Sequence, residues 1–230
     1  MKNIPPVKIA VLIDGGFFVK RFIHLYDKQR TMSGADVADY LYQMAMAHVG
    51  NNNTLYRIFY YDCPPIDKKV HNPITKRAID FSKSPEYKFH KELIERLKTK
   101  RKVAVRLGTL KDNGQWMIRP RVTKELLAGN ISIADLKEDD VYLDIRQKGI
   151  DMKIGVDISS LALKRFVDTI VLFSGDSDFV PASKLARREG IDFILDPMNA
   201  NVAPDLNEHI DGMKNVAPKI KQPQPASNQG

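Results

Sequence analysis

The sequence predicts an α/β protein built around a parallel sheet, and three observations lead to this prediction. Two apolar runs, residues 7–13 and 170–173, lack the alternation of a half-exposed strand, which is typical of strands buried on both faces of a parallel sheet. Each run ends in acidic residues that a helical pattern follows. The chain has 230 residues, 43% hydrophobic and 28% charged, which suits one ordinary globular domain.

The first predicted strand is Val7–Ile13, with Asp14 at its carboxyl end and Gly15-Gly16 directly after it. Glycines allow a backbone to approach a ligand closely. Open α/β sheets bind ligands beyond the carboxyl ends of their strands. We therefore expect Asp14 to lie at the functional edge of the sheet.

Helices and strands are expected to alternate through the middle of the chain. Ser33 is a suitable cap for a helix that continues to Val49, and a strand rich in aromatic residues follows over 55–61. The proline-rich segment 62–85 predicts an irregular loop, either functional or simply mobile. An amphipathic helix is expected over 86–100 and a further strand over 103–110.

The segment 111–147 is predicted to be an irregular insertion within a single domain that spans residues 1–215. Asp112-Asn113-Gly114 favours a turn into Gln115–Ile118, which would form a hairpin carrying the sole tryptophan, Trp116. Much of the remainder of the insertion is charged and has no clear pattern.

The last part of the chain is expected to close the fold and then lose order. After the helical segment 158–166 and the strand 170–173, a short strand is predicted over 191–195 and a helix over 205–213. Residues 216–230 are rich in Pro, Gln and Ser, a composition that predicts disorder.

Two carboxylates, Asp176 and Asp178, stand in the turn between the strand 170–173 and a helical pattern that starts at Phe179. Crowded carboxylates repel each other unless a cation or a proton lies between them. Hard divalent cations such as Mg²⁺ bind carboxylate oxygens of this kind. The alternative interpretation is structural, because Asp178 is also a suitable N-cap for the helix.

Two further carboxylates, Asp151 and Asp157, lie between the insertion and the strand 170–173. A separation of six residues corresponds to about 120° around an ideal helix axis, so one helix would not place both on the same face. Asp151 is expected to precede or begin the helix, with Asp157 one to two turns inside it. Asp151 has the alternative role of a helix cap.

The chain is strongly basic, with a net charge of +8 and a pI of about 9.4. This favours a polyanionic partner, because Lys and Arg displace condensed counterions from phosphates; a basic solvated surface is the alternative. Cys63 is the only cysteine, which excludes an internal disulfide and a cysteine-based zinc site and fits a cytoplasmic protein. No apolar run approaches membrane-spanning length, and the N-terminus lacks the form of a secretory signal.

These segments together resemble the NYN domains of the PIN-like nuclease superfamily, and the LabA-like bacterial branch is the most similar. The resemblance extends over roughly residues 7–213, and its pieces follow the family's order and spacing: Val11-Leu12-Ile13-Asp14-Gly15, then Lys148-Gly149-Ile150-Asp151 through Asp157, then Ser174-Gly175-Asp176-Ser177-Asp178-Phe179. It implies a Rossmann-like three-layer α/β/α sandwich with a mainly parallel sheet. It also implies an acidic pocket for Mg²⁺ or Mn²⁺ and cleavage of RNA phosphodiesters.

The leading functional hypothesis is a metal-dependent ribonuclease acting on single-stranded or structured RNA. Its expected catalytic and metal-binding residues are the aspartates of the three matching pieces, Asp14, Asp176 and Asp178, with Asp151 or Asp157. The residues expected to contact nucleic acid are basic and lie near these pieces: Lys148, Lys153, Arg21 and Arg106, with Lys20 and Arg187 as further candidates. No membrane partner is expected, and the sequence leaves the oligomeric state open.

Two alternatives accompany this hypothesis. Many family members carry Asn three residues after the first-strand aspartate, where this chain has Phe17, and this departure favours an RNA-binding regulatory module without turnover. The other alternative is a metal-dependent phosphatase. Phosphatases of the haloacid dehalogenase type carry an Asp-x-Asp motif on the first strand, whereas Asp14 is followed here by two glycines.

Overall fold

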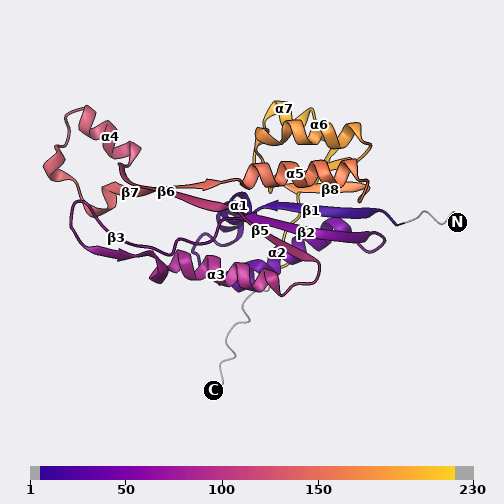
Figure 1. Cartoon of the computed structure of the whole chain (residues 1–230), viewed down its shortest axis with the longest axis horizontal. Helices are drawn as coiled ribbons and strands as arrows, with labels where there is room; N and C mark the ends of the chain where they lie inside the picture. The colour runs from indigo at the N-terminus through magenta and orange to yellow at the C-terminus, as the bar shows by residue number, and fades with distance from the viewer. Residues whose placement is uncertain (1–5, 221–230) are drawn as a thin grey trace, which may run out of the picture.

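The computed structural model describes residues 6–220, and a six-stranded sheet forms its centre (Figure 1). The strand order is β10-β9-β8-β1-β2-β5, and every neighbouring pair is parallel. The bounds of these strands, in chain order, are β1 Lys8–Asp14, β2 Thr54–Asp62, β5 Val103–Leu107, β8 Thr169–Phe173, β9 Asp192–Asp196 and β10 Gly212–Met213.

Helices cover both faces of this sheet. One face packs against α1 Gly15–Tyr26, α2 Gly34–Val49 and α3 Pro85–Lys98, and the other against α5 Ile150–Leu163, α6 Val180–Arg188 and the short α7 Pro204–Asn207. Figure 1 shows α5, α6 and α7 above the sheet, with α2 and α3 below it. The predicted three-layer α/β/α sandwich is confirmed. None of the helices within residues 6–220 has the length and apolar character needed to cross a membrane.

The strand β1 separates two hydrophobic cores. Ile9, Val11 and Ile13 enter the core shared with α1, α2 and α3, whereas Ala10 and Leu12 enter the core shared with α5 and α6. This alternation follows from the two-residue period of a strand. Both faces are apolar because both are covered, which explains the continuous apolar run in the sequence.

An arm, defined here as residues 109–148, projects from the sandwich as a long antiparallel ribbon (Figure 1). Its strands are β6 Thr109–Ile118 and β7 Val141–Lys148; between them lie α4 Pro120–Leu127 and the 3₁₀ turns Ile133–Asp135 and Glu138–Asp140. A shorter ribbon supports the arm, with strands β3 Lys69–His71 and β4 Ala78–Asp80, and a 3₁₀ turn, Phe81–Lys83, links it to α3. The Asn72 amide donates to the Glu138 carbonyl oxygen at 3.3 Å, which ties the two ribbons together.

The arm is more regular than the sequence pattern predicts. The prediction of a turn at Asp112-Asn113-Gly114 is wrong. This stretch lies within β6, where the pairing register with β7 shifts between Asp112 and Trp116. The expected strand 103–110 is divided, since β5 ends at Leu107 and β6 pairs with β7 instead of with the main sheet. Most residues of β6 are exposed, so the ribbon lacks the apolar alternation by which strands are recognised.

The end of the chain also differs from the prediction. The prediction of a helix over 205–213 is wrong. The helix α7 ends at Asn207, because the chain then returns to the sheet and pairs β10 with β9. Asp211 fixes this return by accepting from the Phe193 amide at 2.9 Å. Val216, expected to open a disordered tail, donates its amide to Asp196 Oδ2 at 3.2 Å, and residues 221–230 of that tail lie outside the described part of the chain.

Two glycines give a first test of this packing. A Cβ atom on Gly34, where α2 begins against α3, would lie 1.9 Å from the carbonyl oxygen of Phe89, whereas a Cβ on Gly155 within α5 would meet no atom within 4 Å. We expect Gly34→Ala to lower the free energy of unfolding by about 3 kcal/mol through overpacking. Gly155→Ala should raise it by up to about 1 kcal/mol, because Ala favours a helix. Urea unfolding checks both signs, and a Gly34→Ala protein of unchanged stability would contradict the close α2–α3 contact.

Candidate functional site

The candidate site lies at the carboxyl ends of β1 and β8. The strand order changes direction at β1, because β2 and β5 lie on one side of it and β8, β9 and β10 on the other. The helices that follow β1 and β8 pack on opposite faces of the sheet. This is the position at which open α/β sheets bind ligands.

Asp14 ends β1 and is partly buried at this edge. Its Oδ1 accepts from the Phe17 amide at 3.1 Å, so the side chain caps α1 and its orientation is fixed. Burial raises the pKa of Asp14 from 3.8 to about 6; the Phe17 amide opposes this shift, and the negative charges of Asp151 and Asp62 add to it. Asp14 therefore stands among carboxylates rather than beside a cation.

Gly15 allows α1 to begin immediately after Asp14. A Cβ atom at this position would lie 2.6 Å from the Tyr60 hydroxyl and 2.7 Å from the carbonyl oxygen of Tyr61. The helix can therefore start against β2 only because residue 15 has no side chain. This contact places the Asp14 cap directly at the sheet edge.

Asp62 is a further carboxylate at this edge, and the sequence pattern did not indicate it. It ends β2, is 2% exposed, and accepts from the Tyr60 hydroxyl and from the Cys63 amide, both at 2.7 Å. His90 Nδ1 lies 3.8 Å from Asp62 Oδ2. The sequence does contain a pattern that could have indicated Asp62, because residues 55–61 form a third predicted strand that ends in an aspartate. The prolines that follow favoured the assignment of Asp62 to a loop.

Asp151, Asp176 and Asp178 form a second part of the same edge. Burial raises the pKa of Asp151, and the charges of Asp176 and Asp178 raise it further, so the three carboxylates lie near one another. Asp151 is the second residue of α5, and Gly149, in a left-handed conformation with φ 81°, occupies the N-cap position. Asp151 is therefore not the helix cap, the alternative that its position in the sequence allowed.

The turn after β8 is capped by a different aspartate from the one the sequence suggested. Asp176 Oδ1 accepts from the Asp178 amide at 3.0 Å and caps the 3₁₀ turn Ser177–Phe179, from which α6 continues at Val180. The alternative interpretation, in which Asp178 caps the helix, is wrong, because the Asp178 amide is the donor in this cap. Its own side chain is exposed at the edge.

Asp157 has different partners. It lies within α5, where its Oδ2 accepts from the Tyr61 hydroxyl at 2.8 Å. Arg106 contacts both carboxylate oxygens of Asp157, with Nε 2.9 Å from Oδ2 and Nη2 3.1 Å from Oδ1. Burial raises the pKa of Tyr61, and the charge of Asp157 adds to this effect. The structure thus groups Asp157 with Tyr61 and Arg106 rather than with the four carboxylates Asp14, Asp151, Asp176 and Asp178.

The arginines expected to contact nucleic acid are held by groups of the protein itself. Arg21 donates to the carbonyl oxygen of Met198 from Nε at 3.2 Å and from Nη2 at 2.8 Å. Arg187 pairs with Asp211 at 2.8 Å, and Arg106 is engaged by Asp157. Each arginine therefore has a structural role in these contacts.

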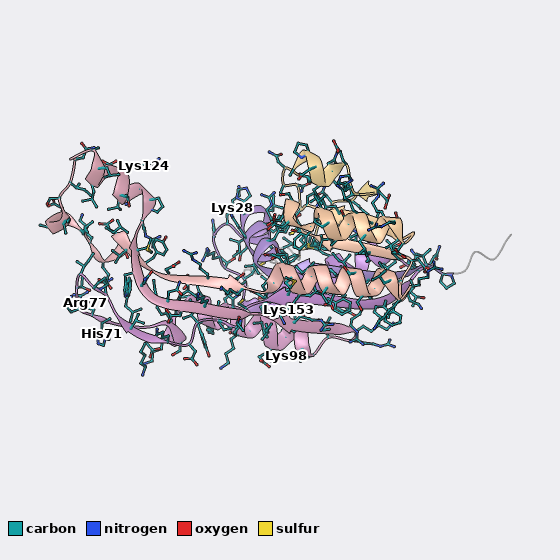
Figure 2. All side chains as sticks on the ribbon, turned by 45° about the horizontal axis from the view of Figure 1, so that its top comes forward. Lys28, His71, Arg77, Lys98, Lys124 and Lys153 are labelled. Carbon is teal, nitrogen blue, oxygen red and sulfur yellow. The ribbon has the colours of Figure 1, made fainter. Side chains whose placement is uncertain are left out.

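The lysines among the expected contacts differ from the arginines. Lys20 on α1, Lys148 at the end of β7 and Lys153 on α5 are exposed, and in the described residues 6–220 none of them pairs with a carboxylate. Figure 2 shows Lys153 on the outer side of α5. These three side chains are available to a polyanion.

Phe17 packs against the turn that carries Asp176. It is half-buried, and its ring carbon Cε2 lies 3.3 Å from the position that a Cβ on Gly175 would take. An apolar ring, and not an amide, therefore fills the space between the end of β1 and the turn after β8.

The fold and the edge can be compared with known proteins. The sequence model of the NYN domain matches residues 8–203, a range that contains all four carboxylates of the edge. The chain belongs to the NYN domain family. NYN domains are PIN-like nuclease domains, so the family predicted from the sequence is confirmed.

One solved structure is similar to this NYN domain along nearly its whole length. It is the crystal structure of a protein of unknown function from Vibrio parahaemolyticus RIMD 2210633, with a TM-score of 0.48 and 15% sequence identity. The similarity covers 94% of this chain and 97% of that chain. No curated protein has a sequence that matches the chain.

The donor set of this NYN domain fits a hard divalent cation. Mg²⁺ keeps several waters and commonly takes one or two carboxylates together with substrate phosphates. Within residues 6–220 no three His, Cys, Asp or Glu side chains already stand together as a complete metal-binding group. The pKa of Asp14 is raised mainly by burial and further by the charges of Asp151 and Asp62, and a bound cation would favour the ionised form of this carboxyl.

The raised pKa of Asp14 predicts that the contribution of this residue to stability falls as the pH rises. Between its unfolded value of 3.8 and its folded value of about 6, the folded state holds a proton that the unfolded state has released. The contribution of Asp14 to the free energy of unfolding in metal-free buffer should therefore fall across this range and stay lower above it. Asp14→Asn keeps the cap and removes the titration, so it should exceed the wild type by about 2 kcal/mol near neutral pH and match it near pH 4.

Urea unfolding in EDTA at the two pH values measures this difference. A stability gain in Asp14→Asn that is the same at both pH values would contradict a raised pKa at Asp14.

The different partners of Asp157 and Asp151 predict opposite behaviour. Asp157→Asn should lower the free energy of unfolding by about 1–3 kcal/mol, because it weakens charged hydrogen bonds to Tyr61 and Arg106, and should keep the stabilisation by Mn²⁺. Asp151→Asn should cost nothing in EDTA, because it relieves repulsion, and should reduce the shift that Mn²⁺ causes. Thermal melts of both variants with EDTA and with Mn²⁺ decide this, and loss of the Mn²⁺ shift in Asp157→Asn would place Asp157 among the metal ligands.

Proposed function

We propose that this NYN domain is a metal-dependent ribonuclease that hydrolyses RNA phosphodiester bonds at the edge formed by β1 and β8. One observation carries the proposal: four carboxylates from three distant segments, Asp14, Asp151, Asp176 and Asp178, come to one edge. The charge of Asp151 adds to the burial that raises the pKa of Asp14, and the charges of Asp176 and Asp178 add to the burial that raises the pKa of Asp151. Among residues 6–220 no Lys, Arg or His side chain forms a salt bridge with any of them. Like charges that stand close together are costly unless a cation or a proton lies between them, so this arrangement supports a site for an external cation.

Two of the carboxylates are fixed before any ligand binds. Asp14 and Asp176 each use Oδ1 to accept a backbone amide, from Phe17 and Asp178 respectively. In each case Oδ2 accepts no hydrogen bond from the described residues and can serve as a ligand atom. The caps therefore hold the rotamers, and binding needs little further ordering of these side chains.

Mg²⁺ or Mn²⁺ is the proposed cofactor, held by Asp14, Asp151, Asp176 and Asp178. When bound, such an ion lowers the pKa of a water molecule and stabilises the charge on phosphoryl oxygens. The role of Asp157 in this proposal is to fasten α5 to β2 and β5 through Tyr61 and Arg106. Asp157 thereby fixes the helix whose first turn presents Asp151.

The charge distribution supports RNA as the substrate. Residues 68–102, which contain β3, β4 and α3, hold 12 Lys and Arg and 4 Asp and Glu, so their net charge of +8 equals that of the whole chain. Lys20, Lys148 and Lys153 stand closer to the carboxylates and are unpaired among the described residues. The cations would hold the backbone of the polyanion while the carboxylates act on one phosphodiester.

Within the family, we place the chain in the LabA-like branch on its three motifs. A second candidate function is an RNA-binding regulatory module without turnover. The packing of Phe17 against the turn that carries Asp176 favours this candidate, because the ring supplies no polar group that could orient water or phosphate.

Incubation of labelled single-stranded and hairpin RNAs with the purified protein tests the proposal. We expect cleavage with Mn²⁺ or Mg²⁺ and none in EDTA. Asp14→Asn and Asp176→Asn should each reduce the rate by about 100-fold or more, since even the loss of groups that only support metal ligands costs about 10–100-fold. Asp192→Asn is the matched control, because this exposed aspartate opens β9 at the opposite edge of the sheet.

The same experiment separates the rival functions. RNA binding without metal-dependent cleavage over a broad panel of RNAs would support the regulatory module. Hydrolysis of p-nitrophenyl phosphate in place of RNA would support a phosphatase.

A further inference from the structure

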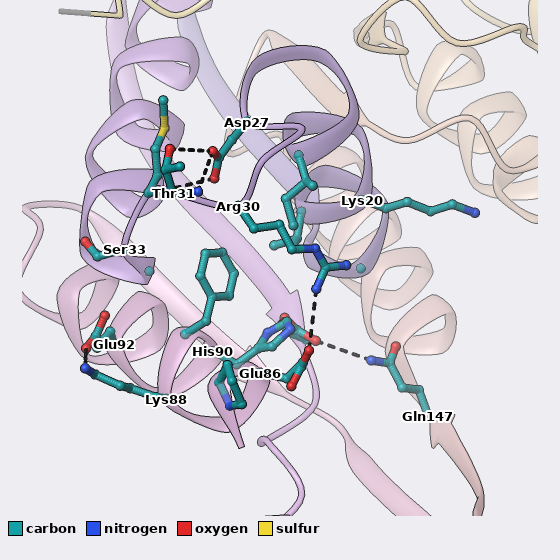
Figure 3. A pocket seen from close by; sticks show the side chains of 18 residues that line it. Lys20, Asp27, Arg30, Thr31, Ser33, Glu86, Lys88, His90, Glu92 and Gln147 are labelled. Carbon is teal, nitrogen blue, oxygen red and sulfur yellow. Dashed lines mark hydrogen bonds and ion pairs between the residues drawn. The ribbon is translucent and has the colours of Figure 1, made fainter. Parts of the chain in front are cut away.

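A cavity of about 660 Å³ opens beside the carboxylate edge, between α1 and the start of α3 (Figure 3). Its wall includes Gly16, two residues after Asp14, and Asp62, whose charge contributes to the raised pKa of Asp14. The cavity and the edge are therefore neighbours. Its size falls in the range of about 300–1,000 Å³ that is typical of small-molecule sites.

One part of the cavity wall is apolar and carries an aromatic ring. Val19 and Ile23 come from α1, Met32 from the connection to α2, and Phe89 from α3. Aromatic rings and apolar side chains are the surfaces on which single-stranded bases stack.

The remaining wall is polar and carries charges of both signs, the cations Lys20, Arg30 and Lys88 and the carboxylates Asp27, Asp62, Glu86 and Glu92. Lys88 pairs with Glu92 at 3.9 Å, and Arg30 pairs with Glu86 at 3.5 Å, with both side chains of the second pair largely exposed at the rim. Figure 3 shows Arg30 and Glu86 meeting from opposite sides, whereas Lys20 extends outward from α1. Weak exposed pairs of this kind exchange readily for a phosphate.

Two side chains between the cavity and the carboxylate edge can read a base. Gln147, from the base of the arm, donates to Asp62 Oδ1 over a long distance of 3.4 Å, and His90 stands 3.8 Å from the other oxygen of Asp62. Both contacts are loose, so the amide and the imidazole remain able to bond a ligand. Both residues also line a second cavity of about 480 Å³ that extends toward β4 and the basic segment 68–102.

We propose that the 660 Å³ cavity binds one unpaired nucleotide of the RNA strand, next to the phosphodiester at the carboxylate edge. The base stacks on Phe89 against the apolar wall, Gln147 and His90 contact its polar edge, and Lys20 and Arg30 hold the flanking phosphates. The position of the cut relative to this nucleotide rests on the proposed ribonuclease function. The base pocket gives the protein a preference for single-stranded RNA, because a paired base cannot enter it.

Filling the cavity tests this inference. Met32→Trp adds bulk to the apolar wall, and Met213→Trp is the matched control, since Met213 is exposed on β10 at the far edge of the sheet. Phe89→Leu is a second variant that removes the ring and keeps an apolar side chain. Thermal melts verify that each variant is folded before binding is measured.

Binding is measured in EDTA, where no metal-dependent cleavage occurs, with the four nucleoside 5′-monophosphates and with a fluorescein-labelled single-stranded RNA. We expect Met32→Trp and Phe89→Leu to bind both probes about tenfold more weakly than the wild type, as the loss of a stacked base predicts. Met213→Trp should bind like the wild type.

Unchanged affinity of folded Met32→Trp and Phe89→Leu would overturn the inference. If Met32→Trp and Phe89→Leu lost as much affinity for a blunt RNA duplex as for the single strand, the inference would also be overturned. That result would mean that the two substitutions weaken contacts to the RNA backbone instead of contacts to an unpaired base. If the protein cleaves no RNA and the expected binding pattern is found, the nucleotide site stands and the ribonuclease proposal fails.

Discussion

The site depends on one constraint, the burial and mutual repulsion of carboxylates at the ends of β1 and β8. Backbone amides hold Asp14 and Asp176 in place, Asp151 lies near Asp14 and Asp176, and within residues 6–220 no basic side chain forms a salt bridge with any of the three. Such crowding lowers the free energy of unfolding, so the rest of the fold must offset it. The offset comes from β1, in which Ala10, Val11, Leu12 and Ile13 are all completely buried between two cores. The central strand is therefore fully packed just before the edge at which the carboxylates crowd together.

Much of the sandwich could be predicted because its strands are buried on both faces. That environment forces continuous apolar runs, and the carboxyl ends of parallel strands lie at one edge, so Asp14 and Asp176 could be assigned to this edge from the sequence. The arm could not be predicted in the same way. Most of β6 is exposed and carries no apolar pattern, and the alternation in β7 is limited to Val141, Leu143 and Ile145.

The site was predictable only where local sequence determines the position of a side chain. Asp157 and Asp151 lie six residues apart, and the sequence left open which of them joins Asp14, Asp176 and Asp178. Their roles separate because Asp157 meets Tyr61, 96 positions away, and Arg106, 51 positions away. Partners so distant in sequence are set by strand order and helix placement, which no local pattern encodes. The same holds for Asp62, whose neighbours His90 and Gln147 come from α3 and the arm.

The buried position of Cys63 has a practical consequence. Cys63 is 3% exposed, and burial raises the pKa of its thiol, so little of the reactive thiolate forms near neutral pH. A maleimide reagent will therefore react much faster with a cysteine introduced on the surface than with Cys63. Since Cys63 is the only native cysteine, a spectroscopic label can be attached to the arm or to α3 without first engineering a cysteine-free background.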